Sequence, residues 1–367
     1  MKLIKRQWIL LPIEVKVRDF QSRTLLAYSA LNAGYGVILG SNNNLNKALP
    51  YLPKGLYLDK SIARNKFSEI NSRVKMGYLY ASLDEEGLGY HKNPNDYAKT
   101  RFSENTLELT KAVFSWGKGE ANSIIDEYPH HKKRLIVTGN PRIDLWTSKF
   151  RKIYEKDKKE LIKKYGRFIL IPSNFSGYIN ASGVDTLINQ AKSFQKIKTP
   201  EEERRFREQL NHKQKNLEGY IEAINELSKS LTDHTIIVRP HPSDDQDYWK
   251  TKLASLSNVK VIYQGTITPW LLAAEAIIHH GCTTGLESYL LNIPTIMYLP
   301  FLDERFDKYL SRNVSYQIYK LDELLKIIIE ISNNTRQSHS FYFKNNQDMV
   351  REYINKNIAS LGEDEFA

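Results

Sequence analysis

The chain has 367 residues, of which 41% are hydrophobic and 26% are charged, a composition that excludes a disordered protein. One hydrophobic core rarely serves so long a chain, so two domains are expected. The net charge of +11 favours an anionic partner, and the longest apolar runs are too short to cross a bilayer.

Sequence motifs narrow the choice of anionic partner. No RNA-binding signature, zinc knuckle or recognition-helix pattern is present, so nucleic acid is not expected. Much of the basic charge lies in lysine-rich helical stretches, which are typical of a solvated face; docking on the anionic inner face of the cytoplasmic membrane is the alternative. The single cysteine, Cys282, excludes a disulfide framework and indicates a cytoplasmic protein.

Apolar runs in the first half alternate with amphipathic stretches, which is the pattern of βαβ units and a parallel sheet. The run WILLPI, residues 8–13, is preceded by basic residues but has no cleavage site, so it is predicted as a strand instead of a signal peptide. A helix is predicted over 20–34, ending at Gly34. Further strands are predicted over 36–40, 112–117 and 134–142.

The second half repeats this alternation. A long helix opens with Thr199, Pro200 and Glu202, which form a capping-box pattern. The strands predicted here cover 168–174, 234–240, 259–265, 274–281 and 293–300. The late stretch NQDMVREYINKNIASL has the apolar stripe of a helix that packs on a preformed surface.

These elements predict an α/β fold with two Rossmann-like, doubly wound domains that face each other across a cleft. The predicted segments are an N-terminal domain (1–150), a charged helical linker (151–166), a C-terminal domain (167–335) and a C-terminal helix or tail (336–367) that packs back. Ligands in such folds bind beyond the carboxyl ends of the strands, so the loops there are the candidate sites.

Several familiar ligand-binding motifs are missing from those loops. No phosphate-binding G-x-x-x-x-G-K-[ST] loop occurs, and the glycines of GYGVILG (34–40) precede a strand instead of following one, which argues against a dinucleotide site. No H-E-x-x-H, C-x-x-C or comparable spacing indicates a metal site. No metal and no resident cofactor are therefore expected.

The first candidate loop is YASLDEEGLGY (80–90), with Asp84, Glu85 and Glu86 side by side. Adjacent carboxylates repel one another and raise at least one pKa, which suits acid–base or nucleophilic chemistry. An acidic turn with a flexible glycine is the alternative interpretation.

The second loop follows the strand in HTIIVRPHPSDD and holds Arg239 and, between two prolines, His241. A guanidinium can bind a phosphate or carboxylate through two hydrogen bonds, and an imidazole can donate to a leaving phosphate. The prolines stiffen the loop before a ligand arrives. A histidine bonded to the backbone is the alternative.

The third loop, in IIHHGCTTGLES, follows a strand that ends at His280 and leads into a helix predicted to begin near residue 286. Cys282, Thr283 and Thr284 precede that helix, and small residues with hydroxyls at a helix N-terminus favour anion binding. Glu287, one turn into the helix, could accept hydrogen bonds from a ribose. Simple capping by threonine and a small buried cysteine are the alternatives.

The order of Glu85-Glu86-Gly87, His241-Pro242 and Thr283/Thr284 resembles the motifs of bacterial GT-B glycosyltransferases that use CMP-activated 2-keto-3-deoxy sugar acids, including sialyltransferases and Kdo transferases. Most of residues 8–300 resembles the surface-carbohydrate biosynthesis group of that superfamily. The supporting stretches are LLPIEVKVRDFQSRTLLA, DEEGL, VTGNPRIDLW, VRPHP and HHGCTTGLES.

This resemblance implies a role for each motif. His241 would contact the CMP phosphate and assist its departure, and Thr283 and Thr284 would hold that phosphate or the sugar carboxylate. Glu85 matches the general base of inverting relatives, and Glu86 is the second motif carboxylate. No metal is implied.

Other site residues follow from their chemistry and place in the chain. Arg239 would neutralise the negative charge of the donor. Glu14 and Arg18, after the first strand, would line the acceptor side. The first loop of the second domain offers Asn174 and Ser176.

That loop contains no acid before Asp185, where retaining relatives carry a nucleophile. Retention and inversion therefore stay open. If the reaction is retaining, Glu85 or Glu86 is the favoured covalent partner and Asp185 the third choice.

The expected function is transfer of pseudaminic, legionaminic or sialic-type nonulosonic acid, or of Kdo, from its CMP donor to a capsule or lipopolysaccharide acceptor. That acceptor is a glycan or a lipid-linked oligosaccharide, reached in the cytoplasm or at the inner face of its membrane. The first alternative is a CDP-glycerol or other polyol-phosphate transferase of wall polymer synthesis. A non-catalytic polysaccharide assembly protein and a nucleotide-sugar epimerase are the other two.

Overall fold

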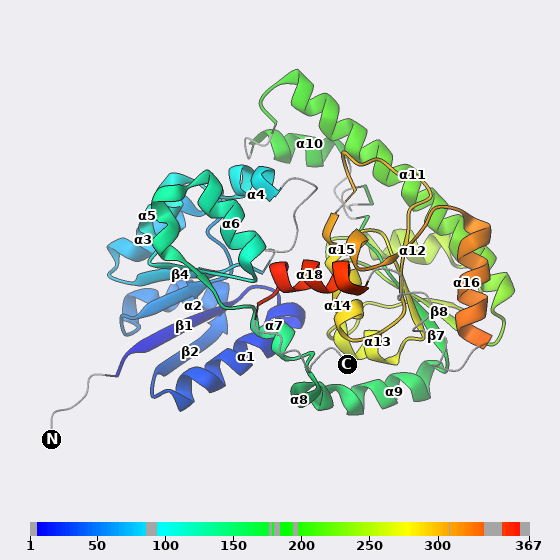
Figure 1. The fold of residues 1–367 in the computed structure, drawn as a ribbon, viewed down its shortest axis with the longest axis horizontal. Helices are drawn as coiled ribbons and strands as arrows, with labels where there is room; N and C mark the ends of the chain where they lie inside the picture. The colour runs from blue at the N-terminus through cyan, green and yellow to red at the C-terminus, as the bar shows by residue number, and fades with distance from the viewer. Residues whose placement is uncertain are drawn as a thin grey trace. The chain divides into compact units, whose positions relative to one another are not determined.

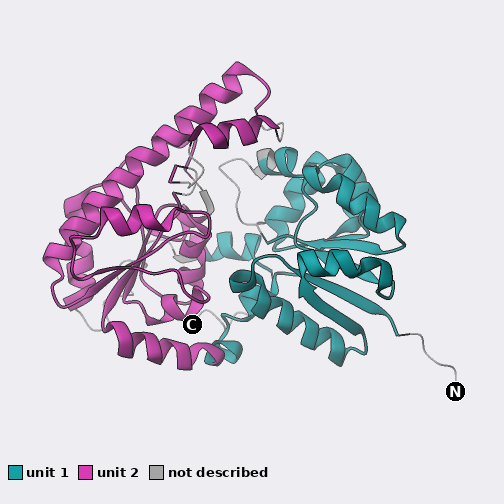
Figure 2. Ribbon diagram, turned by 180° about the vertical axis from the view of Figure 1, so that it is seen from behind, with its two compact units in different colours: residues 1–152, 351–367 teal, residues 153–350 magenta. Residues whose placement is uncertain are grey.

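Two parallel sheets, each surrounded by helices, form the protein (Figure 1). The computed structural model describes residues 6–85, 94–175, 178–179, 184–193, 197–307, 309–333 and 347–359. Two units divide the chain (Figure 2): unit 1 comprises residues 1–152 and 351–367, and unit 2 comprises residues 153–350. The architecture confirms the predicted α/β class with two doubly wound domains.

The sheet of unit 1 has the strand order β2-β1-β3-β4-β5-β6, so its winding reverses between β1 and β3. Its strands are β1 (Trp8–Ile13), β2 (Gly36–Ser41), β3 (Leu56–Asp59), β4 (Leu79–Leu83), β5 (Ala112–Ser115) and β6 (Leu135–Val137). Successive side chains of a strand point to opposite faces, and Leu10 and Leu11 accordingly lie in separate hydrophobic clusters. Both faces of this sheet are therefore packed.

Short helices connect the strands of unit 1. They are α1 (Lys16–Asn32), α2 (Asn42–Ala48), α3 (Phe67–Lys75), α4 (Pro94–Arg101), α5 (Glu104–Leu109), α6 (Lys118–Glu127), α7 (Pro141–Asp144) and α8 (Ser148–Arg151). The α1 helix ends just before Gly34, as predicted. The φ of Gly34 is +88°, a conformation that other residues rarely adopt.

The sheet of unit 2 has the order β12-β11-β10-β7-β8-β9, with its winding reversal between β10 and β7. Its strands are β7 (Phe168–Pro172), β8 (Thr235–Arg239), β9 (Val259–Val261), β10 (Ala276–His279), β11 (Thr295–Tyr298) and β12 (Tyr316–Ile318). All residues of β7 are buried, as expected for a central strand covered on both faces.

The helices of unit 2 include the longest in the described part of the chain. They are α9 (Glu155–Tyr165), α10 (Val184–Ser193), α11 (Pro200–Ser230), α12 (Gln246–Lys252), α13 (Thr268–Ala273), α14 (Thr283–Leu290), α15 (Tyr309–Asn313) and α16 (Leu321–Asn333). The predicted capping box is confirmed at α11: the Glu202 N–H donates to the Thr199 hydroxyl at 3.2 Å, and the Thr199 N–H donates to the Glu202 carboxylate at 3.0 Å.

The C-terminal helix α18 (Gln347–Asn357) leads into a segment that packs on unit 1. The Ala359 N–H donates to the Trp116 carbonyl at 2.6 Å. The next residue, Gly117, lies so close to the Asn357 backbone that a Cβ atom would overlap it. The prediction that this helix packs back is thereby confirmed.

The sequence analysis missed three short strands and misplaced two helix boundaries. β3, β4 and β12 are brief and carry polar residues, so no continuous apolar run marks them, and residues 80–83 of the first candidate loop belong to β4. The charged segment 151–166 is not one helix, because a 3₁₀ turn at Lys152–Tyr154 precedes α9 and buries Tyr154. The helix after β10 begins at Thr283, one turn earlier than expected.

No helix in the described part of the chain combines the length and apolar composition that spanning a bilayer requires.

Candidate functional site

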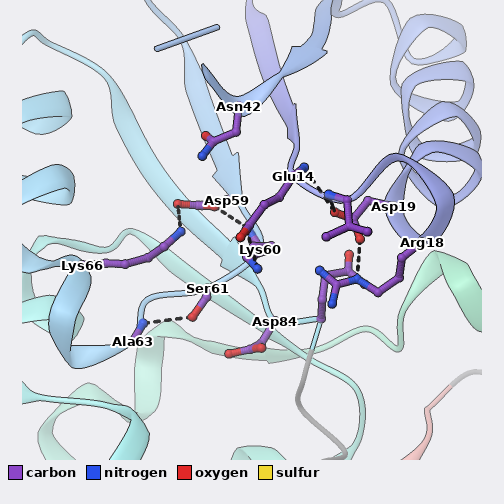
Figure 3. A network of polar contacts seen from close by, with 12 residues as sticks. Glu14, Arg18, Asp19, Asn42, Asp59, Lys60, Ser61, Ala63, Lys66 and Asp84 are labelled. Atoms are coloured by element: carbon purple, nitrogen blue, oxygen red, sulfur yellow. Dashed lines mark hydrogen bonds and ion pairs between the residues drawn. The ribbon is translucent and has the colours of Figure 1, made fainter. Parts of the chain in front are cut away.

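The carboxyl ends of β1, β3 and β4 gather a network of charged side chains in unit 1 (Figure 3). The Lys60 ammonium forms an ion pair with the Glu14 carboxylate, which links the loops after β1 and β3. These two strands flank the point at which the sheet reverses its winding, where doubly wound folds bind ligands.

Asp59, at the end of β3, is a buried member of this network. Its carboxylate accepts a hydrogen bond from the Lys66 ammonium at 2.8 Å and another from the Tyr80 hydroxyl. Burial opposes its charged form, but the Lys66 ammonium and the hydrogen bonds outweigh burial and hold the pKa of Asp59 below its usual range. Asp59 is therefore an anionic anchor of the strand end.

Asp84 is the first of the three adjacent acids, and it is committed to an ion pair. The Arg101 guanidinium binds its two carboxylate oxygens at 2.7 and 2.6 Å. The Trp116 indole N–H donates to the Asp84 carbonyl. This double contact fixes the loop after β4 to α4 and β5.

Glu85 is the predicted catalytic carboxylate, and only 6% of its surface is exposed. Its carboxylate lies 3.6 Å from the nearest Arg23 nitrogen and 3.8 Å from that of Arg142, both beyond hydrogen-bond range. Oε2 has no hydrogen-bond partner among the described residues. Burial raises the pKa of Glu85, and the two guanidinium groups offset that effect only in part. Glu86 lies outside the described residues.

The predicted acceptor-side residues Glu14 and Arg18 are both paired. Glu14 binds Lys60, and the Arg18 Nε–H donates to the Asp19 carboxylate at 2.7 Å. The same carboxylate accepts the main-chain N–H groups of Glu14 and Val15 at 3.2 and 2.9 Å. Asp19 thus holds the turn between β1 and α1 and presents Arg18 there.

Glu120, in α6, is a perturbed acid that the sequence analysis missed. It is 1% exposed and accepts the Trp116 main-chain N–H at 2.9 Å. Burial, together with the charge of Asp84, raises the pKa of Glu120 to about 8. A single glutamate in an amphipathic stretch gives no sequence signal of such burial.

In unit 2, Arg239 ends β8 and is buried. Its guanidinium donates to the carbonyls of Gln264 and Gly265 at 2.8 and 2.5 Å and lies over the rings of Tyr263 and Trp270. Burial lowers the pKa of Arg239 to about 10. These contacts brace the loop after β9; the predicted contact with a donor anion would be an additional role.

His241 is exposed at the same strand end. Its Nδ1 lies 2.6 Å from the Ser243 hydroxyl and accepts the Ser243 main-chain N–H at 3.2 Å. A main-chain N–H can only donate, so Nδ1 is the unprotonated nitrogen and Nε2 carries the proton of the neutral ring. The loop therefore sets the tautomer of His241, and Nε2 is a hydrogen-bond donor.

Asp244 connects the loops after β7 and β8, and the sequence analysis did not single it out. Its Oδ2 accepts from the Ser173 hydroxyl, from the His241 main-chain N–H at 3.1 Å and from the Trp249 indole at 3.3 Å. Burial raises the pKa of Asp244. This one carboxylate holds the backbone of His241 in place.

The loop after β7 also contacts the loop after β10. The Asn174 amide donates to the His280 carbonyl at 3.2 Å. The His280 ring is buried and stacks on Phe175, with their ring centroids 5.1 Å apart. Ser176 lies outside the described residues, and the Asp185 side chain is 91% exposed at the start of α10.

The chain turns from His280 into α14 through Gly281, whose φ is +60°. Cys282 is the half-buried N-cap residue, and its side chain makes no capping hydrogen bond. Thr283 is exposed and Thr284 half-buried in the first turn of α14, and neither hydroxyl has a hydrogen-bond partner among the described residues. Simple capping therefore does not explain the two threonines. Glu287 is buried one turn later.

The sheet order places these groups together in unit 2. β7 lies between β8 and β10, so Asn174, His241 and Thr283 follow three adjacent parallel strands at one sheet edge. The reversal of winding lies between β10 and β7, beside this edge. Three of the predicted loops therefore meet where doubly wound folds bind their ligands.

A further group in unit 2 has the residue types of a metal site. One ligand atom from each of His212, His280 and Asp307 lies within 4.8 Å of the others. Spacing in the sequence did not reveal this group, because its members come from α11, the loop after β10 and the segment after β11.

No family model and no curated protein matches the chain. Solved structures do match it. S. aureus MnaA with UDP is 12% identical, with a TM-score of 0.56, over 97% of this chain and 100% of that one. The UDP-GlcNAc 2-epimerase of Neisseria meningitidis is 12% identical, with a TM-score of 0.52, over 96% of each chain.

The wall teichoic acid polymerase TagF is 9% identical, with a TM-score of 0.57, over 96% of this chain and 85% of that one. The chain has a GT-B fold. At these identities the likeness establishes the architecture, and the chemistry has to be argued from the residues of this chain.

Proposed function

We propose that this protein is a glycosyltransferase that moves a 2-keto-3-deoxy sugar acid from its CMP donor to a bacterial surface glycan or lipid-linked oligosaccharide. The observation that carries the proposal is the edge of the unit 2 sheet, where His241 and the first turn of α14 follow β8 and β10, the two strands that flank β7. The donor sugar carries its own carboxylate in addition to the CMP phosphate, and the chain's net charge of +11 suits such an anion.

His241 is suited to the leaving phosphate. With Nδ1 occupied by Ser243, its Nε2–H can donate to a phosphate oxygen. Negative charge grows on that oxygen as the bond to the sugar breaks, so a donor held there stabilises the transition state more than the ground state.

The first turn of α14 supplies a second anion-binding element. The amide groups at a helix N-terminus carry partial positive charge, and the Thr283 and Thr284 hydroxyls have no described partner to compete with a ligand. We assign them to the CMP phosphate or the sugar carboxylate. Glu287 and Asn174 stand beside this turn as further candidate donor contacts.

Glu85 is assigned to proton transfer with the acceptor hydroxyl. Its raised pKa brings it nearer the working pH, which favours a general base. A general base and a carboxylate nucleophile must both be ionised to act, so the raised pKa of Glu85 does not choose between inversion and a covalent intermediate on this residue.

The test is a panel of CMP-Kdo and CMP-activated sialic, pseudaminic and legionaminic acids. Each is incubated with the protein, with and without EDTA, and CMP release and thermal stabilisation are measured. One CMP-sugar acid should raise the melting temperature and release CMP equally well with EDTA. His241→Ala and Glu85→Gln should each slow release by about 100-fold or more.

A matched control is Glu69→Gln in unit 1, because that glutamate is exposed and the buried Arg73 that pairs with it also has a hydrogen bond to Asn46. This variant should release CMP at the unmodified rate. Absence of release and of stabilisation with every CMP-sugar acid would rule out the proposal.

Polyol-phosphate transfer is the second candidate, favoured by the structural likeness to the wall teichoic acid polymerase TagF. The same assay with CDP-glycerol separates the two, since glycerophosphate transfer would replace the first proposal. A UDP-GlcNAc arm tests the epimerase alternative in the same way.

A further inference from the structure

Three side chains from distant parts of unit 2 converge beside the loop after β10. His212 lies in α11, His280 follows β10, and Asp307 precedes α15. Their ligand atoms all lie within 4.8 Å of one another, and the His212 Nε2 is 2.9 Å from the Asp307 Oδ1. The side chains of His212 and Asp307 are 9% and 2% exposed.

The surroundings hold each of the three side chains in place. Asn216 donates to the carbonyls of His212 and Phe301 at 3.1 and 3.0 Å and accepts the Phe301 N–H at 3.2 Å, which ties α11 to the chain after β11. The Asp303 N–H donates to the Asp307 Oδ2 at 2.8 Å and leaves Oδ1 directed at His212. Such supporting hydrogen bonds are what orient metal ligands in proteins.

His280 is held by aromatic packing. Its ring stacks on Phe175 and meets Tyr220 edge-on, with their centroids 5.9 Å apart. The centroid of the His212 ring lies 6.4 Å from that of the His280 ring. The fold itself thus brings together two imidazole nitrogens and one carboxylate oxygen, with aromatic rings packed around His280.

We propose that His212, His280 and Asp307 bind one divalent transition-metal ion, with zinc as the ion that best suits them. Two imidazoles and one carboxylate are borderline ligands that select zinc or its neighbours over magnesium and calcium, which prefer all-oxygen sites. Ligand atoms around tetrahedral zinc lie roughly 3.3 Å apart, so side-chain adjustment alone closes the set. A water molecule would take the fourth position.

This site goes beyond the proposed transfer reaction, which needs no metal. An ion there would connect α11 and the segment before α15 to the start of the loop that carries Thr283. Its expected effect is to stabilise unit 2, because an ion that binds only the folded chain raises the melting temperature.

The experiment uses the full chain without an affinity tag. Protein stripped with a chelator is titrated with Zn²⁺, and bound metal is measured after gel filtration. One zinc ion per chain and a higher melting temperature are expected. Co²⁺ in place of Zn²⁺ should give the visible absorption of a four-coordinate site.

His212→Ala and Asp307→Asn should weaken zinc binding by at least about 10-fold. Asp307→Asn is the decisive variant, because its amide oxygen keeps one of the two hydrogen bonds that Asp307 makes, with His212 or with the Asp303 N–H, and the melting temperature of the metal-free variant tests whether the fold is retained. The matched control is His234→Ala: that buried histidine also contacts two carboxylates, but Asp233 and Glu275 bind opposite ring nitrogens and cannot share an ion with it.

Zinc binding below one ion per chain, or equal binding by Asp307→Asn and the unmodified protein, would overturn the assignment. The assignment would also be overturned if His234→Ala lost zinc while the melting temperature of its metal-free form stayed unchanged. None of these measurements involves a sugar donor, so failure here and failure of the proposed function are distinguishable.

Discussion

At the scale of single residues, burial changes the chemistry of two glutamates in unit 1. Glu85 lacks a hydrogen bond to Oε2 among the described residues, and Glu120 is enclosed beside Asp84. Both have raised pKa values, whereas Asp59 has a lowered one because Lys66 pairs with it. The neighbours of a carboxyl group thus decide whether its neutral or its charged form is favoured.

Glu120 gives the protein a pH-dependent stability. Its pKa is about 8 in the folded chain, against 4.5 as the ordinary value, so folding takes up a proton between these pH values. The stabilisation is complete below about pH 4.5 and is lost as the pH rises towards 8. Glu120→Gln should remove this dependence, and its melting temperature should exceed that of the unmodified protein at pH 8.

Thermal unfolding from pH 5 to pH 9 measures the effect. The control is Glu104→Gln, an exposed glutamate in the same unit that pairs with His131. Parallel melting curves for Glu120→Gln and the unmodified protein across this range would contradict the assigned pKa.

At the scale of elements, the loop after β7 connects its two neighbours. Ser173 reaches the loop after β8 through Asp244, and Asn174 reaches the loop after β10 through the His280 carbonyl. His241 depends on this arrangement because Asp244 accepts its main-chain N–H. Asp244 is therefore a positioning residue for the imidazole.

Asp244→Ala should destabilise the protein by about 2 kcal/mol, because buried donors lose their acceptor. It should also slow CMP release without changing the pH profile of its rate, since His241 is displaced and not removed. Urea unfolding and the release assay measure the two effects. Asp247→Ala is the control: that side chain is 84% exposed, and its loss should change stability by less than about 0.5 kcal/mol.

Sequence patterns predicted most strands because each is a continuous apolar run, as in WILLPI and FILIP. They failed at β3, β4 and β12, which are short and partly polar. The sequence also predicted that His241 and Thr283 follow strands. The contacts of Arg239 and Glu85 could not be predicted, because tertiary packing sets them. Arg239 contacts carbonyls beyond β9, and Glu85 faces Arg23 and Arg142.

At the scale of the whole molecule, unit 1 is completed by residues from the far end of the chain. Gly117→Ala should disrupt this packing, because its Cβ would overlap the Asn357 backbone. The Ala359 amide, which donates to Trp116, should then exchange its hydrogen faster. Hydrogen exchange of residues 347–359 measures the change. Gly40→Ala is the control, since its Cβ would make only an ordinary contact with Leu45.

Because residues 153–350 form unit 2 and the chain then returns to Trp116, unit 1 is discontinuous along the polypeptide. On the ribosome, its sheet emerges first, yet its last contact must wait until the whole intervening unit has been synthesised. Unit 2, a single continuous stretch, can complete its contacts earlier. The half that starts to fold first is therefore the half that finishes last.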